Sequence, residues 1–594
     1  MGQMMLKYHL TCFLYEVIVM KKGLAVLSGI AAASAAVGSS LLYFKKKDIC
    51  PRCEVKKALA KTKIHYTKDE LYNNGAALTP PMGWSSWNNF RHKIDENVIL
   101  QIAKAVKESG LADAGYVYIN LDDCWQSSMR DENGKMQGDL TTFPHGIKWL
   151  VEQVNAMGLK LGIYSSNGTL TCEDLPASLY NERIDAETFA EWGVEYFKYD
   201  YCHHVLIPTD APYIDSISIG GEGIDGELIF PAKDAILKGE AKVINEENGK
   251  SYVKGICSAM GSIEFNNIVV PTDGEYVLTF VMRKNTCDGQ FCVVTVNDTD
   301  KYDFLIAEQK AFSREGRRQI KVNLKAGTNK IFITNPVGSP MDSAAMQYEK
   351  MGKELVRATK KFAEENNCEE KKILYSICEW GWNQPWKWGG KAGNIWRTTP
   401  DIQPNWMSVV GIYEVNVRLD KYACPGAFND PDMLEVGNGK LTVEENKSHF
   451  TLWAMMAAPL ILGNDIRDFI KEDGSVDADN KILEILTNKD VIAVDQDKLG
   501  IQCSRVKTNG ITDVLVKPLE NNEVAICFFN KGLSKTNMSY SVADLHNIVN
   551  VTLPKAEKYV CKDLWDKTET VVTDTISAEV PSHGVKVYRV SVAQ

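Results

Sequence analysis

Two short acidic motifs hold the side chains best suited to chemistry in this sequence. Lys198-Tyr199-Asp200 ends an apolar and aromatic run, and Arg397-Thr398-Thr399-Pro400-Asp401 follows a second one. Enzymes that hydrolyse glycosidic bonds generally use two carboxyl groups that flank the bond. A single aspartate in such a place is more often a loop carboxylate or a helix cap, but the two motifs together indicate glycoside hydrolysis.

The elements that must position these carboxylates follow a repeating pattern. Helix-like stretches such as 96–109 and 147–157 alternate with short apolar runs. Strands are expected at 82–84, 116–121, 159–164, 195–199, 373–378, 395–396, 427–428 and 455–462. Strands that alternate with helices predict a parallel sheet, and eight such units predict an α/β fold of the (β/α)8 TIM-barrel type.

Polar residues gather where the predicted strands end, which is the face that carries the active site in this fold. The candidate site residues are Trp87, Asp122, Asp123, Lys198, Asp200, Glu379, Arg397, Asp401 and Asp432. As a set at one end of eight strands, they are poorly explained as ordinary loop residues.

The barrel is expected to be discontinuous, over residues 71–206 and 343–500. Residues 207–342 interrupt it with β-type runs and turns and without a long helical pattern, which predicts an inserted β-sandwich domain. Residues 501–594 are again rich in β-type runs and lack a cluster of candidate catalytic residues. They predict a C-terminal antiparallel β-sandwich that packs against the barrel.

Residues 1–70 are predicted to be an N-terminal segment and linker outside the fold. The uncharged stretch 23–44 is long enough to cross a bilayer and is interpreted as a signal anchor. The alternative is a signal peptide cleaved near Ala33-Ser34-Ala35. Dense lysines after this stretch favour a cytoplasmic enzyme, whereas glycan hydrolysis favours an extracellular catalytic domain.

Composition excludes some partners. The net charge of −10 argues against nucleic acid, which attracts basic surfaces. Cys50-Pro51-Arg52-Cys53 is a lone CxxC without a second pair nearby, so a zinc site is not expected. The fifteen cysteines are scattered and odd in number, so this is not a disulfide scaffold. No metal or cofactor is predicted, and the oligomeric state is left open.

Several motifs outside the insertion resemble glycoside hydrolase family 27, which contains α-galactosidases and α-N-acetylgalactosaminidases. The motifs are Met82-Gly-Trp-Ser-Ser-Trp87, Leu121-Asp-Asp-Cys-Trp125, Lys198-Tyr-Asp200, Cys378-Glu-Trp380 and Asn429-Asp-Pro-Asp-Met433. The resemblance implies that Asp200 is the nucleophile of a retaining mechanism and Asp401 its general acid/base, with a raised pKa. The retaining mechanism needs these carboxyls about 5–5.5 Å apart.

The same resemblance assigns the sugar contacts. Asp122 and Asp123 match the pair that binds the 4- and 6-hydroxyls, and Arg397 matches the residue that binds the 2-hydroxyl. Pocket roles also fall to Trp87, Tyr164, Asp432 and to Lys198, whose charge favours ionised Asp200. Cys172 and Cys202 match a family disulfide beside the nucleophile.

Glu379 and Trp382 fall where the family distinguishes a 2-hydroxyl from a 2-acetamido group. Both are large, which favours a galactose-terminated glycan as substrate and hydrolysis of terminal α-D-galactosyl residues. The alternatives are α-N-acetylgalactosaminidase or another specificity of family 27 and, in a different class, an inactive surface lectin. Residues 207–342 resemble carbohydrate-binding modules of families 6 and 35, with a packing domain as the alternative.

Overall fold

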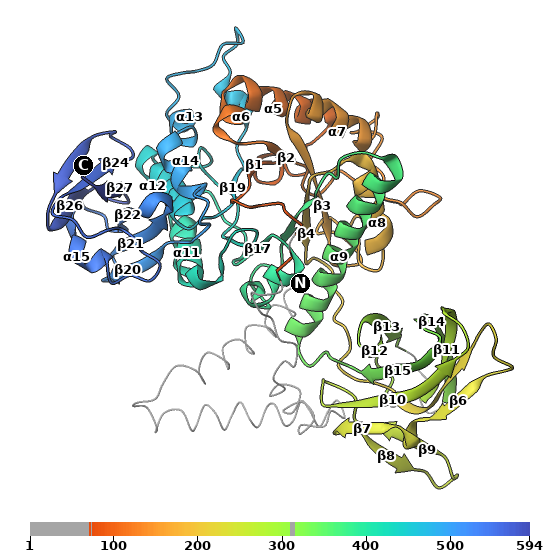
Figure 1. Cartoon of the computed structure of the whole chain (residues 1–594). Helices are drawn as coiled ribbons and strands as arrows, with labels where there is room; N and C mark the ends of the chain where they lie inside the picture. The colour runs from red at the N-terminus through yellow and green to blue at the C-terminus, as the bar shows by residue number, and fades with distance from the viewer. Residues whose placement is uncertain (1–70, 73, 285, 309–314, 594) are drawn as a thin grey trace, which may run out of the picture. The chain divides into compact units, whose positions relative to one another are not determined.

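The computed structural model describes residues 71–593 except 73, 285 and 309–314 (Figure 1). The predicted signal anchor at 23–44 and the cysteines of the CxxC motif lie outside these residues. Within the described ranges, no helix combines the length and the apolar character needed to span a bilayer. The chain forms two compact units, one of which is the insertion Thr209–Ser339. The other holds the described residues up to Pro208 and from Pro340 onward.

Eight parallel strands form the barrel and confirm the predicted fold class. They are β1 Met82–Ser85, β2 Tyr118–Asn120, β3 Lys160–Ser166, β4 Tyr196–Asp200, β16 Leu374–Ile377, β17 Ile395–Arg397, β18 Phe428–Asp430 and β19 Leu460–Leu462. Neighbours in the sheet follow chain order, and β1 also pairs with β19. A parallel bridge between Leu434 and Leu462 closes the ring.

Helices follow most strands, as the alternating pattern predicts. The longer ones are α5 Glu96–Glu108, α7 Ile147–Ala156, α8 Glu182–Trp192, α9 Pro340–Asn366, α11 Trp406–Asn416 and α12 Val443–Met455. Shorter ones are α4 Trp87–Phe90, α6 Leu111–Ala114, α10 Gly389–Ala392, α13 Lys481–Leu486 and α14 Lys489–Asp495. In α5, Asp95 caps the helix by accepting from the Val98 N–H at 2.8 Å. Its buried residues Ile99, Ile102 and Val106 recur at helical spacing.

One strand is shorter than predicted. The apolar run 455–462 begins with the last residue of α12, and only Leu460–Leu462 is strand. Ala457 takes a left-handed φ of 50° between the two elements. A short buried apolar run does not distinguish helix from strand by its periodicity, which is why the sequence pattern merged them.

The insertion is a sandwich of two antiparallel sheets. One holds β5 Tyr213–Gly220, β6 Leu228–Pro231, β8 Lys242–Asn245, β9 Ser251–Lys254, β11 Gly274–Arg283 and β14 Glu315–Leu324. The other holds β7 Ile236–Gly239, β10 Gly261–Val270, β12 Gln290–Val296, β13 Asp300–Ile306 and β15 Gly327–Thr334. Buried residues of both sheets, such as Ile217, Phe280 and Ile331, form one hydrophobic core separate from that of the barrel.

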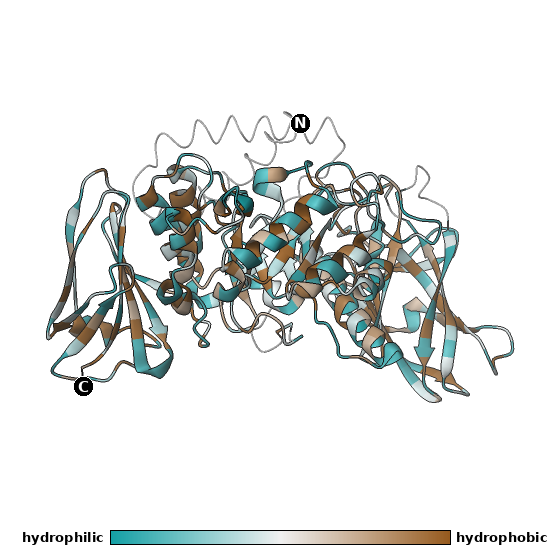
Figure 2. Cartoon of the chain, turned by 90° about the horizontal axis from the view of Figure 1, so that it is seen from above, coloured by the Kyte–Doolittle hydropathy of each residue, from teal (hydrophilic) through white to brown (hydrophobic). Residues whose placement is uncertain are grey.

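The C-terminal domain is also antiparallel. Its larger sheet holds β20 Ser504–Thr508, β21 Thr512–Leu519, β22 Glu523–Asn530, β24 Tyr559–Asp563, β25 Glu569–Val572 and β27 Val585–Val592. A smaller sheet pairs β23 Thr536–Ser541 with β26 Thr575–Val580, and the short helix α15 Val542–Leu545 follows β23. Burial alternates along β24, where Tyr559, Cys561 and Asp563 are buried, as expected for a strand with one buried face. Both hydrophobic and hydrophilic residues occur along the strands near the C-terminus (Figure 2).

Candidate active site

The predicted nucleophile ends strand β4 inside the barrel. Asp200 is 5% exposed, and its Oδ2 accepts a hydrogen bond from the Tyr164 hydroxyl on β3 at 3.2 Å. Its Oδ1 accepts from the Tyr201 N–H at 2.8 Å. Burial raises the pKa of Asp200, and the charge of Lys198 opposes that rise. The carboxylate is thus oriented by two donors in a place where water is scarce.

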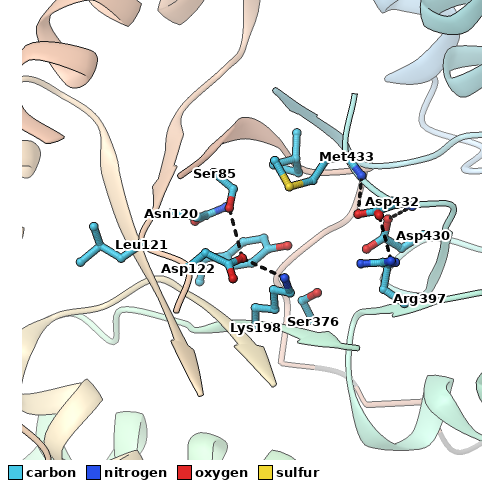
Figure 3. A pocket seen from close by; sticks show the side chains of 12 residues that line it. Ser85, Asn120, Leu121, Asp122, Lys198, Ser376, Arg397, Asp430, Asp432 and Met433 are labelled. Atoms are coloured by element: carbon cyan, nitrogen blue, oxygen red, sulfur yellow. Dashed lines mark hydrogen bonds and ion pairs between the residues drawn. The ribbon is translucent and has the colours of Figure 1, made fainter. Parts of the chain in front are cut away.

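Lys198 binds Asp122 directly. Its Nζ lies 2.8 Å from Asp122 Oδ2, which also accepts from Ser85 Oγ at 3.4 Å (Figure 3). The ammonium also lies 5.3 Å from the ring centroid of Tyr164. Burial favours the neutral amine, but Asp122 and Asp200 hold the pKa of Lys198 well above its usual value. A fixed positive charge therefore stands between the nucleophile and the predicted hydroxyl-binding pair.

Asp123 accepts hydrogen bonds from backbone N–H groups of two loops, those that follow strands β2 and β3. Its Oδ1 accepts from the Cys124 N–H at 2.8 Å and its Oδ2 from the Glu173 N–H at 3.0 Å. Burial raises its pKa to about 6. The loop after β3 holds Cys172, which forms the predicted disulfide with Cys202, with 5.1 Å between the Cα atoms. Asp123 and the disulfide thus both hold one loop, which lies beside Asp200.

A second charge cluster surrounds Arg397, which is 3% exposed. Its Nη2 lies 2.8 Å from Asp432 Oδ2 (Figure 3). The same nitrogen lies 2.8 Å from Asp401 Oδ1. Burial raises the pKa of Asp432 to about 7 although Arg397 opposes it. Asp432 also accepts from the Ile402 N–H at 2.8 Å, which ties it to the loop that carries Asp401.

Asp401 has the opposite pKa shift from the one predicted. Its side chain is 61% exposed, and although partial burial raises its pKa, the ion pair with Arg397 lowers it overall. The expectation of a raised pKa is wrong for this structure, because the sequence did not reveal that ion pair. Asp401 raises the pKa of Asp200 through its charge, so the two carboxyls interact electrostatically.

Glu379 and Trp382 differ in their exposure to solvent. Glu379 is fully buried, and its Oε2 accepts from the backbone and side-chain N–H groups of Asn383 at 2.7 and 3.0 Å. Its other oxygen makes no hydrogen bond to the residues described, and burial raises the pKa of Glu379 well above its usual value. Trp382 is 57% exposed. Glu379 therefore holds the loop that carries Trp382, and its contact with the sugar stays a prediction.

Trp87 lies in the short helix α4 after β1. The guanidinium of Arg91 lies 5.9 Å from the ring centroid of Trp87. Arg91 adopts a left-handed φ of 51° and contributes to the low pKa of Asp401 through its charge. The loop after β1 therefore reaches towards the acid/base candidate.

A cavity between the strands contains part of the predicted set and several residues that sequence reasoning missed. Its lining is Ser85, Asn120, Leu121, Asp122, Tyr196, Lys198, Ser376, Arg397, Asp430, Asp432, Met433 and Ile461. Asn120, Ser376 and Asp430 are polar residues inside short apolar strands, a signal that could have revealed them. Arg91 gave no comparable signal, because it lies in a loop.

Among the residues described, Cys172, Asp200 and Cys202 place their ligand atoms within 4.8 Å of one another. The two sulfurs are bonded to each other, so they are not thiolates that could hold a metal ion. The disulfide instead ties the end of the nucleophile strand to the preceding loop.

Comparisons with known proteins agree with this geometry. The sequence matches the family model of α-galactosidase A over residues 79–215 and 342–497, and that of the α-galactosidase C-terminal β-sandwich domain over 509–590. It is 34% identical to α-galactosidase 2 of Arabidopsis thaliana over 520 residues, covering 87% of this chain and 91% of the relative. The chain belongs to the α-galactosidase family.

Other members of the α-galactosidase family show similar agreement. The α-galactosidase of Cyamopsis tetragonoloba is 32% identical over 527 residues, covering 88% of this chain and 89% of the relative. The crystal structure of α-galactosidase I from Mortierella vinacea aligns with a TM-score of 0.59 and 28% identity. That alignment covers 88% of this chain and 100% of the other.

Proposed function

We propose that this member of the α-galactosidase family is a retaining exo-glycosidase that releases terminal α-D-galactosyl residues. One observation carries the proposal: the barrel interior holds buried Asp200 beside Lys198, which is paired with Asp122, and Asp401, which is paired with Arg397, acts on Asp200 through its charge. The cavity between the strands is lined by Asp122, Lys198, Arg397 and Asp432 among others, which are residues that the resemblance assigns to the sugar.

The proposed mechanism uses Asp200 to attack the anomeric carbon while Asp401 protonates the departing oxygen. A covalent galactosyl-enzyme forms, and Asp401 then removes a proton from the attacking water. In the structure, Arg397 keeps the pKa of Asp401 low, which suits the second step. A sugar 2-hydroxyl that takes over the Arg397 hydrogen bond would release Asp401 to act as an acid in the first step.

We expect the purified protein to hydrolyse an aryl α-galactoside at least about tenfold faster than the matching α-N-acetylgalactosaminide, a difference of about 1.4 kcal/mol in activation free energy. Proton NMR should show α-galactose as the first product, before mutarotation. Faster turnover of the acetamido sugar would favour the alternative specificity. A first product in the β form would reject the retaining mechanism, and binding without turnover would indicate a lectin.

The disulfide also bears on the compartment in which the catalytic domain works. Disulfides persist in oxidising compartments, so the Cys172–Cys202 bond supports a catalytic domain outside the cytoplasm. We propose that residues 23–44 hold it at the membrane as a signal anchor or direct its secretion.

The inserted sandwich is proposed to bind the glycan that carries the terminal galactose. It leaves the barrel after Pro208, eight positions beyond the nucleophile, and has its own hydrophobic core. Replacing residues 209–339 by a flexible linker should spare activity on a small aryl galactoside, which cannot reach both domains. It should raise the KM for a galactose-substituted polysaccharide severalfold. Equal losses on both substrates in a folded deletion variant would instead support a packing role.

A further inference from the structure

We propose that Tyr348 is a positioning residue for the nucleophile: its hydroxyl fixes the peptide group between Asp200 and Tyr201, whose N–H orients the Asp200 carboxylate. This inference rests on the proposed function and adds to it a residue that reaches the reacting group only through the backbone. Its evidence is a set of hydrogen bonds between helix α9, which follows the insertion, and the end of strand β4.

The Tyr348 hydroxyl binds the main chain at the nucleophile itself. It donates to the Asp200 carbonyl oxygen at 2.9 Å, across 148 positions of the sequence. The Tyr348 side chain is fully buried, and its ring lies edge to face with Tyr199 at 5.4 Å and 5.6 Å from the ring of Trp388. Burial raises the pKa of Tyr348 well above its ordinary value, so the hydroxyl keeps its proton and remains a donor at neutral pH.

The peptide group that Tyr348 contacts is also the one that binds the nucleophilic carboxylate. Its oxygen accepts a second hydrogen bond, from the Asn167 N–H at 2.8 Å, and two donors fill the capacity of a carbonyl oxygen. Its other end is the Tyr201 N–H, which donates to Asp200 Oδ1 at 2.8 Å. Because a peptide group is planar and rigid, donors that hold its oxygen also fix the direction of its N–H.

Helix α9 is itself held against the segment that follows the nucleophile. Ser343 Oγ accepts from the Ile207 N–H at 2.8 Å. Gln347, four positions later and so on the same face of the helix, donates to the Val205 carbonyl at 2.8 Å. Gln347 Oε1 also accepts from the Asn167 side-chain amide at 3.1 Å. The helix that supplies the first donor to the nucleophile's peptide group therefore also holds the residue that supplies the second.

This arrangement connects the Tyr348 hydroxyl to the reactivity of Asp200. Hydrogen bonds in series polarise one another, so donation to a carbonyl oxygen strengthens the N–H at the other end of the same peptide group. Burial raises the pKa of Asp200, and the Tyr201 N–H is among the groups that oppose this rise. Loss of the hydroxyl should therefore weaken that N–H, let the carboxylate turn and raise the pKa of Asp200.

The titratable groups around Asp200 come from its own strand and from the ends of neighbouring strands. They are Lys198, Asp122, Tyr164, Cys378 and Asp401. Replacing Tyr348 by Phe removes none of them and changes no charge. A change in the titration of Asp200 in that variant would therefore report the lost hydrogen bond.

The alternative is that the Tyr348 hydroxyl only satisfies a buried carbonyl. Its removal would then lower stability without changing the titration or the reactivity of Asp200. Tyr116 offers a matched control, because it is also fully buried and donates to a backbone carbonyl, that of Leu486, at 2.9 Å. Tyr116 precedes strand β2, at the end of the barrel opposite the active site.

The experiment compares Tyr348→Phe and Tyr116→Phe with the unchanged protein. Aspartate labelled with ¹³C at the side-chain carboxyl reports the titration of Asp200 by NMR, and the signal of Asp200 is identified by its absence from Asp200→Asn. In Tyr348→Phe the pKa of Asp200 should rise by at least about half a pH unit, and in Tyr116→Phe it should stay in place. An unchanged titration in Tyr348→Phe, or an equal rise in both variants, would overturn the positioning role.

A second measurement uses the pH dependence of kcat/KM on an aryl α-galactoside. The nucleophile must be ionised, so a higher pKa moves the acid limb of this profile to higher pH in Tyr348→Phe. At the optimum, kcat should fall about tenfold because the carboxylate is less well aimed. The inhibition constant of galactose should change less than about twofold, since the charged side chains of the cavity are untouched. An unmoved acid limb would contradict the proposal. If the unchanged protein failed to hydrolyse the galactoside, the proposed function would fail, and the NMR titration would still decide the role of Tyr348.

Discussion

Replacing Asp200 by Ala should lower kcat on an α-galactoside by about 10⁴-fold or more, because no covalent intermediate can form. Replacing Asp401 by Ala should lower it about 10²–10⁴-fold when the leaving group needs a proton. With α-galactosyl fluoride, whose leaving group needs little help, the Asp401 variant should keep most of the rate of the first step. Steady-state and burst kinetics on both substrates measure these differences.

Azide separates the two roles by stereochemistry. In Asp200→Ala, azide can occupy the space of the missing carboxylate and attack from the β face, which gives the β-galactosyl azide. In Asp401→Ala, azide attacks the galactosyl-enzyme from the α face in place of water, which gives the α-azide. Asp473→Ala removes an exposed carboxylate far along the chain and should leave the rate unchanged. The same azide anomer from both variants would refute the assignment.

Arg397→Met should reduce both activity and stability. Arg397 is buried and binds Asp401 and Asp432 through one nitrogen, so its loss leaves buried Asp432 without its counter-ion. Breaking a buried ion pair by removing one partner costs about 3–5 kcal/mol. Urea unfolding measures this loss. Arg467→Met, at a more exposed arginine paired with Asp465, should cost at most about 1 kcal/mol.

The destabilisation by Arg397→Met should depend on pH with a definite sign. Arg397 lowers the pKa of both Asp401 and Asp432, so both values rise in the variant. A carboxyl with a folded pKa above its unfolded value loses stability as pH rises between the two. Because burial already raises the pKa of Asp432 to about 7, the variant should lose more stability relative to wild type at pH 8 than at pH 5. A larger loss at pH 5 would contradict this electrostatic picture.

The sequence pattern predicted which side chains lie at the strand ends of the barrel, but it did not predict their ion pairs, pKa shifts and burial. Alternation along a strand was enough to place Lys198 and Asp200 on one side of β4, since side chains two positions apart face the same way. The pKa of Asp401 depends on its ion pair with Arg397. The two residues are four positions apart in the sequence, but that spacing alone does not show that their side chains meet. Residue size placed Glu379 near the sugar, but it did not reveal that the carboxyl is fully buried and bonded to Asn383.

The insertion also bears on how the barrel is completed during folding. Strands β4 and β16 are neighbours in the sheet, with Tyr196 paired to Leu374, yet the whole inserted domain separates them in the chain. As the chain leaves the ribosome, the first four strands are finished while the edge that ends in Asp200 still lacks its partner. Closing a long loop costs little more than closing a shorter one, but long-range pairing is slow. Because the insertion has its own core, it can collapse first and shorten the effective tether between the two halves. Strand β4 therefore waits across the whole insertion for its partner, and its free edge, like that of β1 until β19 is made, is open to aggregation before the barrel closes.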